Sequence, residues 1–224
     1  MKNIISNFAV FEGVDGSGTS TQLSLLKERL TKAGLDEGKF FLTFEPAQNP
    51  VGLLIRSALK KNIELRPQTL ARLFAADRAE HLYAGGGIVE RCARGELVVC
   101  DRYILSSLVY QGIECGDELP HSLNSSFPAP ELLIYLDVDS EVAQRRLQNR
   151  PLREIYEQSD FQFLVRKKYL SLLDECRTDG TCVEVIDASQ EAEKVADEVW
   201  RALSILPIFK TEPPRSGRCE PSWR

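Results

Sequence analysis

Phe8-Ala-Val-Phe-Glu-Gly-Val-Asp-Gly-Ser-Gly-Thr-Ser-Thr21 joins an apolar run to an amphipathic one through a glycine-rich stretch. The apolar run is typical of a buried strand, and the residues that begin Gln22-Leu-Ser-Leu-Leu26 have the pattern of a helix. Between them, Gly13, Gly18 and Ser20 match the phosphate-binding pattern G-x-x-x-x-G-K-[ST]. The sequence therefore predicts a strand, a phosphate-binding loop and a helix. We call this loop, residues Gly13–Ser20, the P-loop.

One position departs from the pattern, because Thr19 stands where the pattern has lysine. The glycines still let backbone N–H groups converge on phosphate oxygens, and the following helix adds the dipole of its N-terminus. The alternative is an ordinary glycine-rich turn between a strand and a helix. We predict that the loop binds the phosphates of a nucleoside triphosphate and that the hydroxyl of Ser20 contacts Mg²⁺. The residues predicted to bind this nucleotide, which the family resemblance given below implies to be ATP, are Gly13, Asp15, Gly16, Ser17, Gly18, Thr19, Ser20 and Thr21.

The composition is that of one acidic domain. A chain of 224 residues is long enough for a sizeable core, and its net charge of −5 argues against general binding of nucleic acid or membranes. No stretch is long and apolar enough to span a membrane, and the N-terminus lacks a signal-peptide pattern. The six cysteines form no C-x-x-C pair, and Cys92 and Cys100 lie in apolar surroundings, which is typical of reduced thiols in the cytoplasm. With only His81 and His121, a histidine-based metal site is not expected.

Apolar strand candidates alternate with helical patterns along the chain. The predicted strands are Phe8–Phe11, Lys39–Phe44, Glu96–Cys100, Leu132–Asp137 and Cys182–Ile186. The predicted helices are Ser20–Ala33, Val51–Lys60, Pro67–Tyr83, Ile88–Arg94, Leu105–Gln111, Glu141–Asn149, Asp160–Cys176 and Glu191–Leu203. This order predicts an α/β fold of the P-loop NTPase type, with a five-stranded parallel sheet covered by helices on both faces. We expect a loop-rich insert at Gly112–Pro130, one domain over 1–206 and a loosely ordered tail over 207–224.

Polar residues follow several of the predicted strands. Ligands of a parallel sheet bind at the carboxyl ends of its strands, so the P-loop should meet the other strand ends at one edge. The residues at those ends are Glu45, Asp101, Arg102 and Asp137. Asp101 is a second candidate ligand for Mg²⁺, and Arg102 is expected to bind an anion. The alternatives are a helix cap for Asp101 and a surface ion pair for Arg102.

Two further features are consistent with phosphate chemistry. Phe74 and Arg78 are four residues apart and share one face of a helix, although Phe74 alone would indicate core packing. Arg150 and Arg153 lie in a short charged segment, 150–157, which is either a solvated connector or a lid over a phosphoryl group. The sequence has no Ser-His-Asp arrangement, zinc pattern or evident general base. Transfer to an existing phosphate needs no base, because its oxygens are already anionic.

Five blocks of sequence, in this order, resemble the thymidylate kinase family. They are Phe11-Glu-Gly-Val-Asp-Gly-Ser-Gly18, Phe44-Glu-Pro46, Leu73-Phe-Ala-Ala-Asp-Arg-Ala-Glu-His81, Asp101-Arg-Tyr103 and Ser106-Ser-Leu-Val-Tyr-Gln111. The resemblance extends over residues 8–203. It implies a homodimer that transfers the γ-phosphate of ATP to dTMP in the presence of Mg²⁺, giving dTDP.

The resemblance also implies roles for single residues. Asp15 would meet the acceptor nucleotide, Phe74 would stack on thymine and Arg78 would donate to a thymine carbonyl. Arg102 would hold the acceptor phosphate, and Tyr110 would exclude a ribose 2′-hydroxyl. The residues implied for binding dTMP are Asp15, Glu45, Phe74, Arg78, Arg102, Ser107, Tyr110 and Gln111. Those implied for catalysis are Asp15, Arg102 and Arg153, the last being preferred over Arg150 as the lid arginine.

Three departures separate the sequence from the family pattern. Thr19 replaces lysine, Phe44 stands where many members have arginine, and Gly85–Gly87 is a small insertion. Two other functions therefore stay open as alternatives. One is a nucleotide-binding protein that has lost phosphoryl transfer together with the lysine. The other is a kinase for a different deoxynucleotide or for a deoxynucleoside, whose neutral hydroxyl needs a base, and Glu45 is the candidate.

Overall fold

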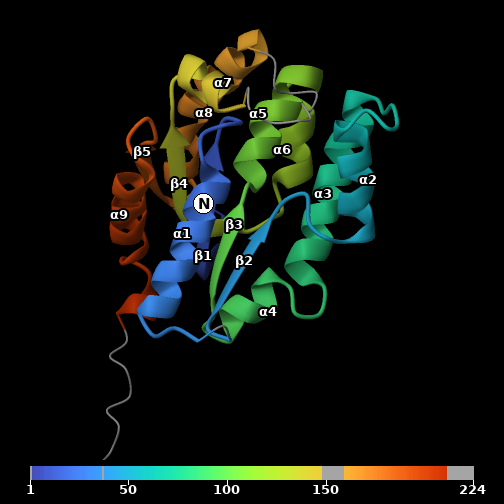
Figure 1. Cartoon of the computed structure of the whole chain (residues 1–224). Coiled ribbons are helices and arrows are strands. Elements are labelled where there is room, and N and C mark those ends of the chain that lie inside the picture. Colours follow the sequence, from blue (N-terminus) through green and yellow to red (C-terminus); the bar gives the residue numbers. More distant parts are fainter. Residues whose placement is uncertain (1, 37, 148–158, 211–224) are drawn as a thin grey trace, which may run out of the picture.

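A sheet of five parallel strands forms the centre of the protein (Figure 1). The structure, a computed structural model, describes residues 2–36, 38–147 and 159–210. The strands are β1 (Ile4–Gly13), β2 (Phe40–Phe44), β3 (Leu97–Asp101), β4 (Ala129–Asp137) and β5 (Cys182–Asp187). Their order is β2-β3-β1-β4-β5, so β1 has neighbours on both sides and is buried along most of its length. The predicted fold class is confirmed.

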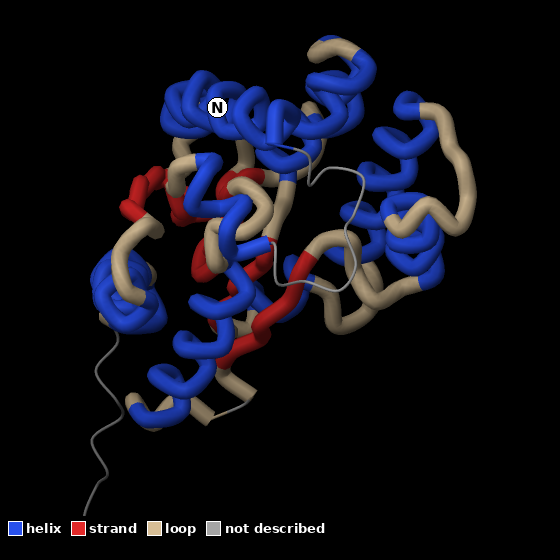
Figure 2. The backbone as a smooth tube through the Cα atoms, turned by 45° about the horizontal axis from the view of Figure 1, so that its top comes forward, coloured by secondary structure: helices blue, strands red, loops and turns tan. Residues whose placement is uncertain are grey.

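Helices cover both faces of the sheet, and Figure 2 shows the strands in red among the helices in blue. They are α1 (Thr19–Lys32), α2 (Pro50–Leu59), α3 (Pro67–Tyr83), α4 (Ile88–Ala93), α5 (Ile104–Cys115), α6 (Glu118–Asn124), α7 (Ser140–Leu147), α8 (Ser159–Thr178) and α9 (Ala192–Leu203). Side chains along β1 alternate between two apolar clusters. Phe8 and Val10 pack with residues of α3, α4 and α5, whereas Ala9 and Phe11 belong to the cluster that contains residues of α1 and α9. Among the residues described, no helix combines the length and apolar character that crossing a membrane requires.

The strand order brings distant polar residues to one edge of the sheet. The arrows in Figure 1 point toward the top of the molecule, so the loops that follow the strands gather there. At that edge, Phe11 pairs with Asp101 of β3, and Gly13 pairs with Leu136 of β4. Phe44, at the end of β2, also pairs with Asp101. The P-loop therefore lies between the ends of β3 and β4.

The segment between α5 and β4 contains more helix than the sequence indicates. Residues Gly112–Pro130 are predicted as a loop-rich insert, but α5 continues to Cys115 and α6 follows it. Pro120 lies in the first turn of α6, where its missing N–H would have had no partner within the helix. The prediction is wrong here because a proline is also a turn signal and α6 has only seven residues.

After α9 the chain packs back against the sheet. Pro207–Phe209 form a short 3-10 helix, η1, and the N–H of Ile208 donates to Oδ1 of Asn7 over 2.9 Å. The ring of Phe209 lies 5.5 Å from that of Trp200. The fold thus continues past the predicted domain boundary, and the rest of the predicted tail, 211–224, lies outside the described residues.

Candidate active site

The P-loop adopts a conformation that depends on its glycines. Gly16 and Gly18 have φ values of 87° and 100°, in the left-handed region where residues with a side chain are strained. A Cβ atom at Gly16 would also lie 2.5 Å from the carbonyl oxygen of Ala143 on α7. The loop therefore exposes main chain rather than side chains, which is the arrangement that binds phosphate.

The carboxylate of Asp101, at the end of β3, lies beside the first turn of α1. Oγ1 of Thr19 donates to its Oδ2 over 3.1 Å, and the next residue, Ser20, is exposed. A carboxylate and a hydroxyl fit Mg²⁺, which prefers oxygen ligands and completes its shell with water and phosphate. Within the described part of the chain, no cluster of three or more acidic, histidine or cysteine side chains could hold a metal. A metal bound beside Asp101 would therefore depend on the phosphate oxygens of a ligand.

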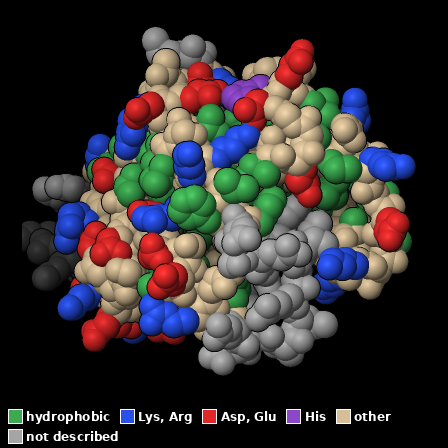
Figure 3. All heavy atoms as spheres, turned by 90° about the horizontal axis from the view of Figure 1, so that it is seen from above, with side chains coloured by type: hydrophobic (Ala, Val, Ile, Leu, Met, Phe, Trp, Pro, Cys, Tyr) green, Lys and Arg blue, Asp and Glu red, His purple; other side chains and the backbone are tan. Residues whose placement is uncertain are grey.

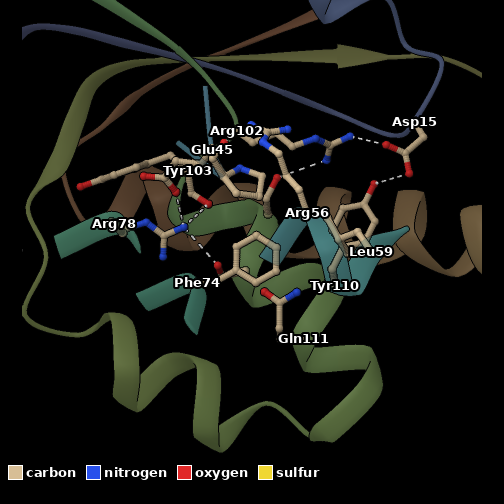
Figure 4. A pocket seen from close by; sticks show the side chains of 13 residues that line it. Asp15, Glu45, Arg56, Leu59, Phe74, Arg78, Arg102, Tyr103, Tyr110 and Gln111 are labelled. Atoms are coloured by element: carbon tan, nitrogen blue, oxygen red, sulfur yellow. Dashed lines mark hydrogen bonds and ion pairs between the residues drawn. The ribbon is translucent and has the colours of Figure 1, made fainter. Parts of the chain in front are cut away.

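A pocket of about 170 Å³ opens beside Asp15 of the P-loop. All eight residues predicted to bind the acceptor line it, and they are Asp15, Glu45, Phe74, Arg78, Arg102, Ser107, Tyr110 and Gln111. Figure 4 shows Arg78 at one end, Arg102 with Asp15 at the other, and the ring of Phe74 between them. Figure 3 looks onto the molecule from above, and basic, acidic and hydrophobic side chains lie close together on this face. The pocket thus has a charged group at each end and an aromatic wall between them.

Arg78 is buried at its end of the pocket and is held from several sides. Its Nη2 donates to Oε2 of Glu45 (2.6 Å), the carbonyl oxygen of Tyr103 (2.9 Å) and Oγ of Ser107 (3.1 Å). Its Nη1 donates to Oδ1 of Asn124 on α6. A buried charge needs such partners, because its desolvation is costly. The guanidinium is thereby fixed in one orientation.

Two buried polar atoms in this pocket have no hydrogen-bonding partner among the described residues. They are Nε of Arg78 and Oε1 of Gln111 on α5. Buried polar groups are nearly always hydrogen-bonded. One donor and one acceptor in the same pocket therefore mark the place where a polar ligand would bind.

The turn before α2 is fixed by a separate set of buried polar groups. Oδ2 of Asp77 accepts a hydrogen bond from the N–H of Ala47 over 2.8 Å, and its Oδ1 accepts one from Nδ2 of Asn49 over 2.7 Å. Burial raises the pKa of Asp77, while these hydrogen bonds act in the opposite direction. Nδ1 of His81 lies 3.4 Å from Oε1 of Glu45. Asp77 thus fixes the turn that follows Glu45, and His81 contacts the Glu45 oxygen that Arg78 does not bind.

Arg102 lies at the other end of the pocket and pairs with Asp15. Its Nη2 is 2.5 Å from Oδ1 of Asp15, and the hydroxyl of Tyr110 donates to Oδ2 over 3.4 Å. The Tyr110 ring centre lies 5.1 Å from the Arg102 guanidinium. Arg102 has a φ of 70°, and its N–H donates to the carbonyl oxygen of Phe11 over 2.8 Å. A left-handed residue with a side chain is uncommon, and such residues cluster at functional sites, which is consistent with the anion-binding role predicted for Arg102.

Helix α8 presents three polar side chains to the same edge. Gln162, Arg166 and Tyr169 are four and three residues apart and share one face of the helix. Nε2 of Gln162 donates to Oδ2 of Asp15 over 2.9 Å, and its Oε1 accepts from the N–H of Asp15 over 3.1 Å. Nη1 of Arg102 donates to the Tyr169 hydroxyl over 3.3 Å. The helix therefore contacts both the P-loop and Arg102.

Asp137 and the predicted lid are both expected at this edge, and of the two only Asp137 lies among the described residues. Asp137, at the end of β4, accepts hydrogen bonds from Nε and Nη2 of Arg166 at 2.8 and 3.0 Å, so its carboxylate is engaged by a helix. The predicted lid, 150–157, with Arg150 and Arg153, lies outside the described residues. The role of these two arginines stays a prediction.

A second pocket, of about 180 Å³, lies beside the start of α1 and is lined by Ser17, Gly18, Thr21, Gln22, Arg146, Ala188, Gln190, Ala192 and Val195. Arg146 on α7 donates from Nη2 to the carbonyl oxygen of Ala188 over 2.9 Å. Its Nη1 is 3.4 Å from the carbonyl oxygens of Gly16 and Ser17. A guanidinium is thus held at the edge of the P-loop.

Arg146 and several other residues at the site are not predicted from the sequence. Arg56 lines the acceptor pocket and lies over the ring of Phe44, with 4.9 Å between the guanidinium carbon and the ring centre. Asn124, Gln162 and Tyr169 contact predicted site residues directly. Apart from Asn124, which falls in the predicted insert, they belong to predicted helices, and an amphipathic pattern does not distinguish a contact with the site from ordinary packing.

Comparisons with known proteins agree with this geometry. The family model described as thymidylate kinase matches residues 11–199. A protein of Treponema pallidum (strain Nichols) named "Putative thymidylate kinase" is 44% identical over 204 residues, covering 90% of this chain and 96% of that protein. A protein of Ligilactobacillus salivarius (strain UCC118) named "Thymidylate kinase" is 35% identical over 213 residues, covering 90% and 98%. The solved structure of thymidylate kinase from Candida albicans is similar with a TM-score of 0.71 and 27% identity, covering 88% of this chain and 91% of that one. The chain therefore belongs to the thymidylate kinase family.

Proposed function

We propose that the chain transfers the γ-phosphoryl group of ATP to dTMP, giving dTDP and ADP, with Mg²⁺ present. The observation that carries this proposal is the pair of buried atoms in the pocket, the donor Nε of Arg78 and the acceptor Oε1 of Gln111. Thymine offers the complementary pair, an acceptor at O4 and a donor at N3. Cytosine offers the reverse, an amino donor at position 4 and an acceptor at position 3. The pocket therefore suits thymine better than cytosine.

The aromatic wall supports binding of a flat base at this end. Phe74 presents its ring between the Arg78 and Arg102 ends of the pocket (Figure 4). A planar base can stack on such a ring in an offset arrangement. Tyr110 lies next to Asp15 and lines the same pocket, which supports a contact with the sugar between the two ends.

The Arg102 end supports a phosphate acceptor. A nucleotide with its base at Arg78 would extend its phosphate toward Arg102 and the P-loop, where a guanidinium can bind two phosphate oxygens. One oxygen of that phosphate then forms a bond to the γ-phosphorus, while the bond to the bridging β–γ oxygen breaks and its electron pair leaves with ADP. No general base is required. Glu45, the candidate base for a nucleoside hydroxyl, is engaged by Arg78 at the opposite end, which argues against a deoxynucleoside kinase.

The donor nucleotide is expected along the P-loop. Its triphosphate would meet the backbone N–H groups, and its adenosine would enter the second pocket beside Arg146. Ser20 and Asp101 would hold Mg²⁺, which neutralises charge on the β- and γ-phosphate oxygens when bound. Because the P-loop has no cationic side chain, the remaining positive charge must come from arginines, and Arg153 of the predicted lid is the candidate.

The proposal includes a cytoplasmic homodimer with dTMP and ATP as its ligands and no binding of nucleic acid or membranes. The family resemblance supports the dimer, and the net charge of −5 argues against a broad cationic surface. The five cysteines within the described residues all have free thiols, as is usual for proteins of a reducing compartment.

A coupled assay of ADP release with dTMP, dUMP and thymidine as separate acceptors tests the proposal. We expect the highest kcat/KM with dTMP, and Arg102→Met should abolish the dTMP-dependent rate while leaving ATP binding intact. Faster phosphorylation of thymidine than of dTMP would contradict a monophosphate kinase. If the natural chain binds ATP without turnover and Thr19→Lys gains turnover, the alternative of a binding protein is correct.

A further inference from the structure

Glu12 is a buried carboxylate that takes no part in the proposed phosphoryl transfer. It directly precedes Gly13 of the P-loop, and none of its side chain is exposed. Its Oε1 accepts hydrogen bonds from the N–H groups of Tyr103 (2.9 Å) and Ser106 (3.2 Å). Its Oε2 accepts from the hydroxyls of Ser106 (2.6 Å) and Tyr169 (3.0 Å). Four donors from two distant segments thus converge on one side chain.

This arrangement favours a negative charge on Glu12. Burial raises the pKa of the Glu12 carboxyl, but the hydrogen bonds from Ser106 and Tyr103 and the charge of Arg102 oppose that shift. Both oxygens already accept two hydrogen bonds, so a proton on either one would face a donor. An amide at this position would likewise direct its NH₂ group toward two donors.

The same two hydroxyls connect Glu12 to Arg102. Nη1 of Arg102 donates to Oγ of Ser106 and to the hydroxyl of Tyr169, each over 3.3 Å. A hydroxyl has one proton and two lone pairs. The two hydroxyl oxygens also lie 2.8 Å apart, so one hydroxyl can donate to the other while the second donates to Glu12. In either case the protons are directed toward Glu12 or within the pair, and a lone pair of each hydroxyl is left to face Arg102. Without the carboxylate, both hydroxyls could turn and present protons to the guanidinium instead.

Arg102 is therefore held on two sides by different groups. Asp15 binds Nη2, and the Ser106–Tyr169 pair, oriented by Glu12, binds Nη1. Asp15 is on the open side of the site, whereas Glu12 is buried behind it. A ligand phosphate can thus exchange with Asp15 while the other side of the guanidinium stays fixed.

We propose that Glu12 is a positioning residue that fixes Arg102 for the phosphate of the acceptor nucleotide. The inference rests on the proposed function, in which Arg102 binds that phosphate. Its one link to the base end of the pocket is the main-chain N–H of Tyr103, whose carbonyl oxygen accepts from Arg78. Both side-chain hydroxyls that Glu12 accepts from face Arg102. Glu12 should therefore act mainly on the affinity that the phosphate contributes, and much less on the affinities for the nucleoside part and for ATP.

The test is the ratio of the dissociation constants of thymidine and dTMP, measured by calorimetry on the full chain. This ratio isolates the phosphate, because both ligands share the same nucleoside. Glu12→Gln should lower the ratio about tenfold or more, because two hydrogen bonds and a buried charge are lost. Tyr169→Phe removes one hydroxyl and should lower it about threefold to tenfold. It also provides the test if Glu12→Gln fails to fold.

Two comparisons separate positioning from a structural effect. Glu96→Gln is the matched control, since Glu96 is also buried but pairs with Arg91 and Arg94 at the amino end of β3. It should leave the ratio unchanged. In an Arg102→Met background, Glu12→Gln should have no further effect on the ratio.

The outcomes distinguish the two proposals. Equal losses of thymidine, dTMP and ATP affinity in Glu12→Gln and Tyr169→Phe would overturn the role of Glu12 alone. A natural chain that binds dTMP no more tightly than thymidine would overturn the role of Arg102, and with it both proposals. A natural chain that prefers dTMP, together with variants that lose this preference selectively, supports both.

Discussion

Oγ1 of Thr19 donates a hydrogen bond to Oδ2 of Asp101 over 3.1 Å. The side chain at the lysine position of the P-loop thus contacts the carboxylate proposed to hold Mg²⁺ and supplies no charge to the phosphates. A hydroxyl cannot replace an ammonium group in neutralising a triphosphate. Binding of ATP by this chain should therefore depend on the metal, and on how firmly Asp101 is held.

Thr19→Val keeps the shape of the side chain and removes its hydroxyl. We expect the Mg²⁺ concentration for half-maximal ATP binding to rise about threefold to tenfold, since the hydrogen bond contributes about 0.5–1.5 kcal/mol. Calorimetric titration of ATP over a series of Mg²⁺ concentrations measures this. Thr19→Ser retains the hydroxyl and should behave as the natural chain does. A Thr19→Val variant with an unchanged requirement would show that the hydrogen bond has no part in metal binding.

Arg153→Ala should lower kcat by about a thousandfold or more, because an arginine that stabilises the transferring phosphoryl group has effects of this size in other enzymes. The affinity for ATP should change much less. Single-turnover kinetics with dTMP, beside equilibrium ATP binding, separate the two effects. Arg150→Ala is the matched control within the same segment. If Arg150→Ala has the larger effect, the role belongs to Arg150.

Tyr110→Ala should raise the use of the ribonucleotide analogue of dTMP relative to dTMP itself. The Tyr110 ring is buried beside Asp15 and the Arg102 guanidinium, and we propose that it occupies the space that a 2′-hydroxyl would need. The ratio of the two kcat/KM values measures the effect. Tyr110→Phe keeps the ring and should keep the discrimination. An unchanged ratio in Tyr110→Ala would show that the ring only packs.

Gln111→Leu should lower kcat/KM for dTMP about tenfold or more, because the proposed partner of thymine N3 is lost. The KM for ATP should stay the same, since Gln111 lies in the acceptor pocket alone. Steady-state kinetics with each substrate varied in turn provide the measurement. The natural chain should also phosphorylate dTMP far better than dCMP. Comparable rates with these two acceptors would refute the assigned pattern of one donor and one acceptor.

Asn124→Ala should lower the free energy of unfolding by about 1–3 kcal/mol, because Nη1 of Arg78 would lose its buried partner. The urea concentration at the unfolding midpoint measures this change. Ser125→Ala is the control on the neighbouring exposed residue, and it should shift stability by no more than about 0.5 kcal/mol. Equal midpoints for the two variants would mean that another group satisfies Arg78.

The sequence predicts those parts of the site that lie within one segment or at strand ends. The P-loop is contiguous, and Phe74 and Arg78 share a helix face through their spacing alone. Glu45, Asp101 and Arg102 lie at the same edge of the sheet because the carboxyl ends of parallel strands gather there. Each of these predictions needs only local periodicity and the topology of the sheet.

Contacts between distant segments could not be predicted in this way. Asp15 and Gln162 exchange two hydrogen bonds although they are 147 positions apart in the chain. Nothing in the spacing around Gln162 distinguishes it from a polar residue on a solvated helix face. Asn124 could not be predicted for a different reason. It lies on α6, and the proline and turn signals of that segment are typical of a loop.

On helix α8, Gln162 contacts the P-loop and Tyr169 contacts Arg102. These two residues are two helical turns apart. Each residue added to a helix rotates everything beyond it by about 100°. One insertion or deletion between these positions would therefore turn one of the two side chains away from its partner. Exchanges on the outer face, where Phe163 and Leu164 are exposed, leave that register intact. Over evolutionary time, this stretch can drift in composition while its length stays the same.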